Sequence, residues 1–441
     1  FFFTHKTAYE MLRSLVGSEM CIRDRDTLES KMGDKMSNTP WKSDQWLTSQ
    51  WNFAPEVTKE INFPEKIQIH DVTLRDGEQQ TGVAFNYDDK IMIAEALAEA
   101  GIHRIEAGMP VVSHQDAKVV SDLAKRNLGP EIFSFARCMV DDVQRAVDSG
   151  VSGVVMEVPS SQHLIELGYR WELERAIDLS IESTKYAHDN GLKVVFFPID
   201  FSRSDLKWVI DLIEKVGNEG HMDALALVDT MGATSIHAMP YFVSAVKERI
   251  NVPLEAHFHQ DFGLGIANTL MAVSMGVEVI HSTVLGLGER AGNVPTEETV
   301  MALKTLYNKD IGIKTENLKG IADLVRDLSG VNVPSNRPIV GDDLFNVESG
   351  IIANWLINCG YENQTELFPF RPSMVGQKEP EIVIGKGSGI DSIKDRLDRF
   401  QIKADDKQAM EILMAIKDWG LKNKRLMNDD EFRKIAEDTL S

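Results

Sequence analysis

The sequence predicts an α/β protein, a (β/α)8 TIM barrel followed by a helical C-terminal subdomain. Between Ile67 and Pro334, short apolar runs rich in β-branched residues alternate with longer amphipathic stretches. This alternation is typical of a parallel sheet covered by helices. Eight such runs occur, and eight strand–helix units are enough to close a barrel. A doubly wound open sheet gives a similar alternation and is the alternative.

The predicted strands follow one another at regular intervals. They are IQIHDV from Ile67, RIEAG from Arg104, IFSFAR from Ile132, GVVMEV from Gly153, KVVFFP from Lys193, ALALVD from Ala224, LEAHFH from Leu254 and VIHSTV from Val279. The intervening stretches have helical periodicity. In DDKIMIAEALAEAG, apolar residues recur at spacings of three and four, and Gly101 ends the helix.

We expect four segments along the chain. Residues 1–25 lack periodicity and the features of a signal peptide, and EMLRSLVGSEMCIRDR resembles translated adapter sequence, so they are predicted to be a non-native or disordered leader. Residues 26–60 are predicted to be an N-terminal extension and 61–335 the barrel. Residues 336–441 are predicted to form a linker and a helical subdomain of two or three amphipathic helices, such as DDKQAMEILMAIKDWGLKNK.

Composition limits the partners and the setting. The 68 acidic residues outnumber 47 basic ones, and the net charge of -21 would repel a phosphate backbone, so no nucleic-acid partner is expected. No run of 18 apolar residues occurs, and no membrane span is expected. The three cysteines, Cys21, Cys138 and Cys359, form no CxxC pair, which favours a reducing, cytoplasmic setting.

Polar residues gather where the predicted strands end, which is where barrel enzymes carry their sites. The first strand leads into TLRDGEQQ, which places Arg75 and Asp76 at its exit. A carboxylate beside a guanidinium stays ionised and can ligate a metal. A structural ion pair at the barrel mouth would explain the same two residues.

The seventh strand carries two histidines, His257 and His259, on the same face, because alternate side chains of a strand share a face. Two imidazoles in the barrel interior need partners, and a divalent cation is a natural one. Ordinary buried histidines are the alternative. Gln260 and Asp261 follow directly, and we expect them to orient the ring nitrogens.

The eighth strand leads into the glycine-rich segment GLGERAGN, which brings the amide of Asn293 to the same rim; Glu289 and Arg290 in this segment could form a rim salt bridge. One carboxylate, two imidazoles and one amide oxygen suit Mg, Mn, Co or Zn and leave positions open for a substrate. A 2-oxo acid can chelate such an ion, while Arg75 stabilises the oxyanion.

Four motifs extend this interpretation over Ile67–Leu306: TLRDGEQQTGVAFNYDDK, IEAGMP, HFHQDFGLGIANTL and GLGERAGNVPTEETVMALK. Together they resemble the DRE-TIM metallolyase superfamily, whose members carry an HMGL-like (pyruvate carboxyltransferase) domain, and within it the Claisen-condensing branch of homocitrate, 2-isopropylmalate and citramalate synthases. The resemblance implies an acyltransferase of amino-acid biosynthesis that condenses acetyl-CoA, or another acyl-CoA, with a 2-oxo acid. It also implies one divalent metal ion and a homodimer.

The resemblance assigns roles to single residues. The metal ligands would be Asp76, His257, His259 and Asn293, and Arg75 would stabilise the enolate. Thr230, Gln79 and Arg137 would bind the substrate. Thr230 matches a threonine that holds the carboxylate of the 2-oxo acid, and Arg137 matches an arginine that faces the distal carboxylate of 2-oxoglutarate, although a rim salt bridge explains Arg137 equally well.

The resemblance weakens after residue 340. Where the family carries FTHEAGIHVDG, this chain has FNVESGIIANW, with Val347 and Ile352 at the histidine positions, and GKHSG is GKGSG, with Gly387. Glu348 is retained and is our candidate for a substitute base.

Two alternative functions stay open. One is a carbon–carbon lyase of the hydroxymethylglutaryl-CoA type, although that branch has cysteines near strand eight and this loop has none. The other is a catalytically inactive barrel that binds a metal or another ligand.

Overall fold

The computed structural model describes residues 39–441 and contains a closed eight-stranded barrel. The strands pair in chain order, all in parallel, and β8 pairs with β1. They are β1 (Gln68–Asp71), β2 (Arg104–Glu106), β3 (Glu131–Arg137), β4 (Gly153–Pro159), β5 (Lys193–Ile199), β6 (Ala224–Asp229), β7 (Leu254–Phe258) and β8 (Val279–Ser282). Each strand coincides with one of the predicted runs, so the fold class is confirmed and the open sheet was the wrong alternative.

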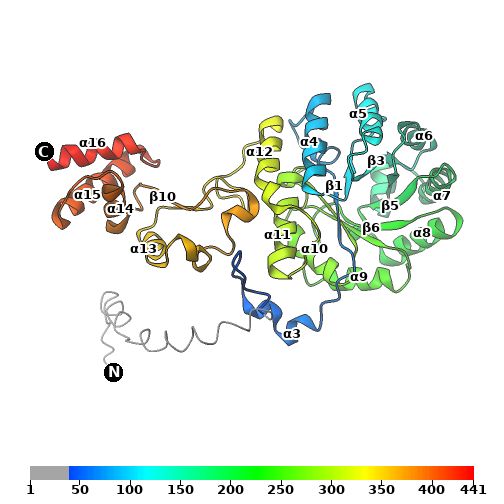
Figure 1. The fold of residues 1–441 in the computed structure, drawn as a ribbon. Helices are drawn as coiled ribbons and strands as arrows, with labels where there is room; N and C mark the ends of the chain where they lie inside the picture. The colour runs from blue at the N-terminus through cyan, green and yellow to red at the C-terminus, as the bar shows by residue number, and fades with distance from the viewer. Residues whose placement is uncertain (1–38) are drawn as a thin grey trace.

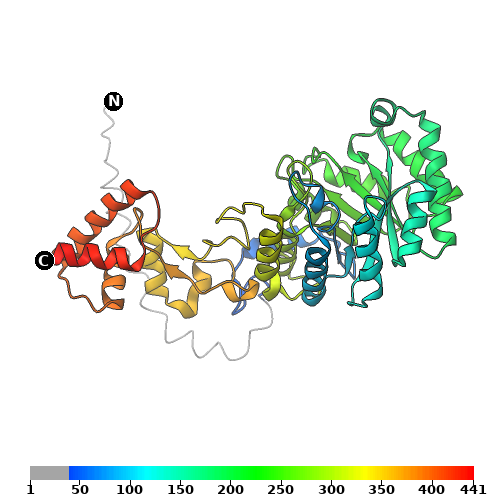
Figure 2. The ribbon, with the colours of Figure 1, turned by 90° about the horizontal axis from the view of Figure 1, so that it is seen from above.

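Helices surround the barrel, as Figures 1 and 2 show. They are α4 (Tyr87–Ala100), α5 (His114–Lys125), α6 (Val140–Ser149), α7 (Leu173–Asp189), α8 (Leu206–Glu219), α9 (Met239–Lys247), α10 (Gly265–Ser274), α11 (Thr296–Leu306) and α12 (Leu318–Ser329). Helix α4 begins with a capping box between Asn86 and Asp89 and ends at Gly101, whose φ of 89° is left-handed. The predicted helix end is therefore confirmed.

Short helical turns connect these elements. They are η2 (Gln50–Phe53), α3 (Pro55–Thr58), η3 (Gly77–Gln79), the π-helix η4 (Leu164–Tyr169), η5 (Phe201–Arg203), η6 (Val284–Gly286), η7 (Thr315–Asn317), η8 (Tyr361–Glu366) and η9 (Pro372–Val375). Two of them, η3 and η4, lie directly after β1 and β4 and shape the barrel mouth.

The C-terminal region contains four α-helices rather than two or three. They are α13 (Gly350–Cys359), α14 (Ile390–Arg399), α15 (Asp406–Asn423) and α16 (Asp429–Leu440), with a parallel pair of short strands, β9 (Asn346–Val347) and β10 (Glu381–Ile382). The sequence GIIANWLINC of α13 is apolar along nearly its whole length, so amphipathic periodicity did not reveal it.

The C-terminal helices form a core of their own. Buried side chains between Ile384 and Ala436 pack together, and in Figures 1 and 2 α14, α15 and α16 lie away from the barrel. The preceding linker differs, because Phe345 and Phe370 pack into the barrel core. Trp46 forms a bridge with Phe370, which ties the N-terminal extension to the same linker. The predicted domain boundaries remain predictions.

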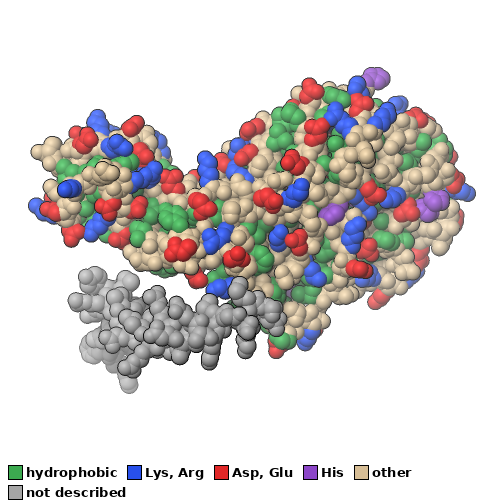
Figure 3. Space-filling model, in the orientation of Figure 1, with side chains coloured by type: hydrophobic (Ala, Val, Ile, Leu, Met, Phe, Trp, Pro, Cys, Tyr) green, Lys and Arg blue, Asp and Glu red, His purple; other side chains and the backbone are tan. Residues whose placement is uncertain are grey.

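Two expectations concern the ends and the surface. The predicted leader, residues 1–25, and the first part of the N-terminal extension lie outside the described residues. Within residues 39–441, no helix combines the length and the apolar character needed to cross a bilayer. Acidic and basic side chains are interspersed over the face drawn in Figure 3.

Candidate metal centre

Three of the predicted ligands meet at the C-terminal end of the barrel. His257 Nε2 lies 3.2 Å from Asp76 Oδ2 and 3.3 Å from His259 Nε2, and His259 Nε2 lies 3.9 Å from Asp76 Oδ2. One ligand atom from each residue lies within 4.8 Å of the other two. All three side chains are buried. The structure therefore brings together one carboxylate and two imidazoles, as the sequence predicted.

The strand order explains this meeting. His257 lies near the end of β7, and His259 follows the strand and forms an antiparallel bridge with Asn293. Asp76 caps η3 directly after β1. Because β8 separates β7 from β1 in the closed barrel, residues far apart in the sequence share one rim.

Asn293 completes the predicted set. Its Nδ2 donates to the carbonyl oxygen of Leu287 (3.0 Å), which fixes the amide orientation. Its Oδ1 and the Oδ1 of Asp76 are buried and have no hydrogen-bond partner within residues 39–441. Buried acceptors without donors are costly, and a divalent cation satisfies both. The residues present therefore fit a metal ion.

A glycine keeps this space open. Gly288 has a φ of 151°, which disfavours any other residue, and a Cβ there would lie 2.3 Å from Asn293 Nδ2 and 3.1 Å from Asp76 Oδ1. The glycine-rich segment after β8 thus lets the backbone pass directly beside two of the predicted ligands.

The electrostatic setting favours the ligand forms of the side chains. Burial alone would raise the pKa of Asp76, but Arg75 and His257 hold it well below its usual range. Burial lowers the pKa of His257 to about 3, against the opposing effect of Asp76, and burial also lowers the pKa of His259. At neutral pH the cluster therefore offers an ionised carboxylate and two neutral imidazoles.

Arg75 is fixed from three sides. Its Nε donates to Glu106 Oε1, its Nη1 donates to Asp76 Oδ2 (3.0 Å), and its guanidinium lies 4.1 Å from the ring centre of Phe135. The structural ion pair considered above is present. Arg75 Nη2 remains buried without a partner in the described part of the chain, so its two N–H groups are available for a ligand.

The orientation predicted for His259 was wrong. We expected Gln260 and Asp261 to hold the ring nitrogens, but His259 Nδ1 lies 3.2 Å from the carbonyl oxygen of Gly292. Gln260 Oε1 instead accepts from Gly265 N (3.0 Å). Asp261 pairs with Arg290 at 2.9 Å, because its side chain points along the rim toward the glycine-rich segment.

Arg290 Nη1 also lies 3.5 Å from Glu289 Oε2, so the rim salt bridge between these two residues is present.

The substrate-binding candidates occupy different places. Thr230 follows β6, and its Oγ1 accepts from Asp200 N (2.8 Å). Its hydroxyl donates to no acceptor within the part of the chain that the structure describes, so it can donate to a ligand. Arg137, at the end of β3, binds Asp142 through Nε (2.6 Å) and Nη2 (3.0 Å), which is the salt-bridge alternative. Gln79 is exposed at the end of η3.

Glu348 lies outside this cluster. It follows β9 in the C-terminal region, and its Oε1 accepts from Gly387 N (2.7 Å).

The sequence interpretation missed a second layer of charge deeper in the barrel. Its members are Glu106, His70, Glu255, His281 and Arg104, and the first four are completely buried. His281 Nε2 lies 2.7 Å from Glu255 Oε2, and Arg104 Nη1 lies 2.6 Å from Glu255 Oε1. A polar residue at every second position of an apolar strand was the available signal.

Comparison with known proteins gives a family. Residues 66–325 match the HMGL-like family, and residues 339–424 match the homocitrate synthase post-HMGL domain-like family.

Three relatives align over most of the chain. A protein of Archaeoglobus fulgidus assigned as an (R)-citramalate synthase is 40% identical over 85% of this chain and 76% of its own length. A protein of Methanopyrus kandleri assigned as a 2-isopropylmalate synthase is 38% identical over 82% of this chain and 71% of its own. The homocitrate synthase of Methanothermobacter thermautotrophicus is 36% identical over 86% and 95%.

A solved structure shows the same fold. The hydroxymethylglutaryl-CoA lyase of Bacillus subtilis superposes with a TM-score of 0.56 at 23% identity, over 62% of this chain and 97% of that one.

Proposed function

This chain belongs to the HMGL-like family, and from this premise we propose that it is a synthase that condenses acetyl-CoA, or another acyl-CoA, with a 2-oxo acid. The relatives assigned as citramalate, 2-isopropylmalate and homocitrate synthases support this activity. The observation that carries the proposal is a pair of buried oxygens, Asp76 Oδ1 and Asn293 Oδ1, that no residue among 39–441 satisfies and that lie beside two neutral imidazoles.

We propose that Asp76, His257, His259 and Asn293 hold one divalent ion, Mg, Mn, Zn or Co. Mixed oxygen and nitrogen donors suit all four. A bound ion would supply Lewis-acid polarisation of the keto group of the substrate.

The surrounding residues supply orientation and charge. Glu106 and Phe135 hold the Arg75 guanidinium in place, so a free N–H of Arg75 can stabilise negative charge on the keto oxygen without reorganisation. The hydroxyl of Thr230 is free to donate to the substrate carboxylate. The acyl-CoA loses an α-proton to a base, its α-carbon bonds to the keto carbon, and water cleaves the thioester to release CoA.

We propose Glu348 as that base, presented by a second copy of the chain in a homodimer. Glu348 precedes helix α13 by two residues, and α13 stands apart from the barrel of its own chain in Figures 1 and 2. Ile351 and Trp355, on the adjacent helix α13, are 67% and 53% exposed, which leaves an apolar face available for a partner. Light scattering that shows a monomer at micromolar concentration would contradict this arrangement.

The proposed function is tested by CoA release. The protein is incubated with Mg, Mn or Zn, acetyl-CoA and either pyruvate, glyoxylate, 2-oxoisovalerate or 2-oxoglutarate, while free thiol is followed and products are identified by mass spectrometry. We expect release with at least one acid and its loss on adding a chelator. Cleavage of a hydroxyacyl-CoA without any condensation would instead establish the lyase.

A further inference from the structure

One carboxylate lies in the barrel mouth on the side away from the metal ligands. The strand pairing places Arg137 of β3, Glu157 of β4 and Phe197 of β5 in one row. The ring of Phe197 lies 4.9 Å from that of His257, so this row faces the barrel interior. Neighbouring residues in a ladder share a face, and Glu157 therefore points into the same space.

The contacts of Glu157 hold it as a hydrogen-bond acceptor. The hydroxyl of Tyr169, at the end of η4, donates to Glu157 Oε1 at 2.8 Å. Among the described residues Tyr169 is the one hydrogen-bond donor to the carboxylate of Glu157, and the side chain is half-buried, which leaves Oε2 as a free acceptor. Arg137 lies beside Glu157 but gives both of its forked donors to Asp142.

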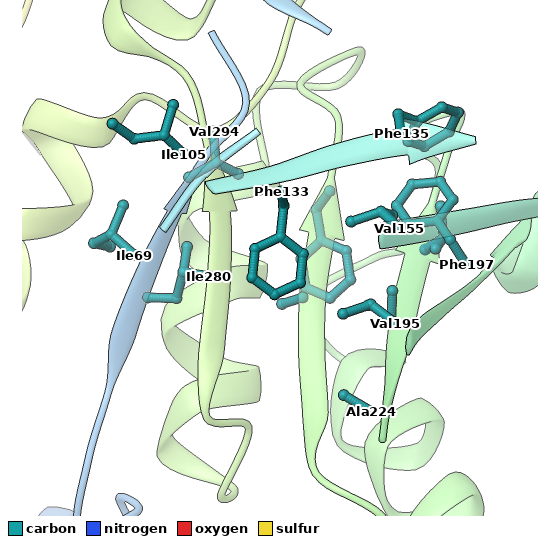
Figure 4. Close-up of a cluster of buried hydrophobic side chains, with 14 of the residues drawn as sticks. Ile69, Ile105, Phe133, Phe135, Val155, Val195, Phe197, Ala224, Ile280 and Val294 are labelled. Atoms are coloured by element: carbon teal, nitrogen blue, oxygen red, sulfur yellow. The ribbon is translucent and has the colours of Figure 1, made fainter. Parts of the chain in front are cut away.

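The walls around this carboxylate are apolar. Phe135 of β3 and Phe197 of β5 pack edge to face with ring centres 5.6 Å apart. Val155 lies on β4, the strand between them, as Figure 4 shows. The two cations that act on Glu157 already pair with other acids, Arg75 with Glu106 and Asp76, and Arg137 with Asp142. A second anion that entered here would lose its hydration and meet Glu157 without an unpaired cation to offset the repulsion.

We propose that Glu157 restricts the substrate to monocarboxylic 2-oxo acids, whose side chain lies against Phe135 and Phe197, and excludes acids with a second carboxylate at the end of that side chain. This inference rests on the proposed function. It replaces the expected contact between Arg137 and the distal carboxylate of 2-oxoglutarate.

The test compares substrates that differ in charge rather than in length. With acetyl-CoA and metal in excess, kcat/KM is measured for pyruvate, 2-oxoisovalerate, 2-oxohexanoate and 2-oxoglutarate. We expect 2-oxoglutarate, a dianion, to be poorer than 2-oxohexanoate, a monoanion with an uncharged side chain, by about 100-fold, the size of one charge repulsion in a partly desolvated site. Glu157→Gln should raise kcat/KM for 2-oxoglutarate by about tenfold or more and change that for pyruvate by less than about threefold.

A matched control separates a local effect from the net charge of -21. Glu289→Gln removes one negative charge from the rim after β8, on the opposite side of the mouth, and should leave the substrate ratio unchanged. If Glu289→Gln changed the ratio as much as Glu157→Gln, the selection would come from the overall charge and the inference would be wrong.

A binding measurement distinguishes failure of this inference from failure of the proposed function. The metal-loaded protein is titrated calorimetrically with the same acids without acyl-CoA. Tight binding of pyruvate or 2-oxohexanoate and weak binding of 2-oxoglutarate supports the inference even where no CoA is released. Equal binding of 2-oxoglutarate by the wild type overturns it, and binding of none of the acids overturns the proposed function as well.

Discussion

The barrel interior holds two buried clusters with the same chemical composition, each of one carboxylate and two imidazoles. The upper cluster is Asp76, His257 and His259, and the lower cluster is Glu255, His70 and His281. In both, one ligand atom from each residue lies within 4.8 Å of the others. Residue types and spacing alone therefore do not separate a metal centre from a structural network.

The two clusters differ in the hydrogen-bond partners of their carboxylates. Both oxygens of Glu255 are engaged, Oε1 by Arg104 and Oε2 by His281, and although burial would raise the pKa of Glu255, these partners lower it to about 2. In the upper cluster, Asp76 Oδ1 and the amide oxygen of Asn293 have no hydrogen-bond donor within residues 39–441. The lower carboxylate therefore has no oxygen left for a cation, whereas the upper cluster offers two oxygens that no described residue satisfies.

The largest effect is expected from a substitution that disrupts the upper cluster. Asp76→Asn keeps the shape of the side chain but removes its charge, and it should weaken metal binding by more than about 100-fold, beyond the loss typical of residues that only support ligands. The control substitution in the lower cluster, His281→Gln, should leave the binding of one ion per chain unchanged. Calorimetric titration with Mn or Zn measures both. Two ions per wild-type chain would show that the lower cluster also binds metal.

The second prediction concerns a substitution that disrupts the lower cluster. Glu255→Gln removes the nearer acidic partner of Arg104, which is half-buried and keeps Glu131 at 3.6 Å, and it takes the carboxylate away from the buried His281. It should reduce the free energy of unfolding by about 3 kcal/mol, the lower end of the loss for a buried pair, measured by denaturant titration of the metal-free protein. The double variant Glu255→Gln, Arg104→Met removes both charges and should recover part of this loss. A single variant as stable as the wild type would show that the ion pair does not stabilise the barrel.

The strands and the upper cluster were predictable for a physical reason. Strands buried on both faces read as continuous apolar runs, and His257 and His259 interrupt such a run at its end. Because parallel strands of a barrel end at one rim, Asp76 and Asn293 could be assigned to the same site before their distances were known.

The lower cluster and the orientation of His259 were not predictable in the same way. A single polar residue within a strand, such as Glu106 or His70, does not reveal which partner lies across the barrel, because that depends on strand register. The contact of His259 with the Gly292 carbonyl depends on the backbone path through a glycine-rich loop. The ion pair of Arg137 with Asp142 could not be distinguished from a substrate contact by sequence, and the substrate contact stays a prediction.

A third buried carboxylate, that of Glu297, extends the comparison, and the effect expected from its substitution is the smallest of the three. Glu297, in the first turn of α11, accepts from Leu285 N (3.1 Å) through Oε2, while its buried Oε1 has no partner among residues 39–441. Burial raises the pKa of Glu297 to about 7, only partly offset by Arg337, whereas the cationic partners of Glu255 lower its pKa.

A raised pKa in the folded state means that the folded protein binds the proton more tightly than the unfolded chain. The contribution of protonated Glu297 to the free energy of unfolding is therefore fully present below 4.5, the pKa in the unfolded chain. It is lost as pH rises through about 7, the pKa in the fold. The shift corresponds to about 3 kcal/mol at most. Glu297→Gln, which remains neutral, should match the wild type near pH 4.5 and exceed its free energy of unfolding at pH 8. Denaturant titrations at several pH values measure this difference, and equal pH slopes for the two proteins would show that Glu297 is already ionised in the fold.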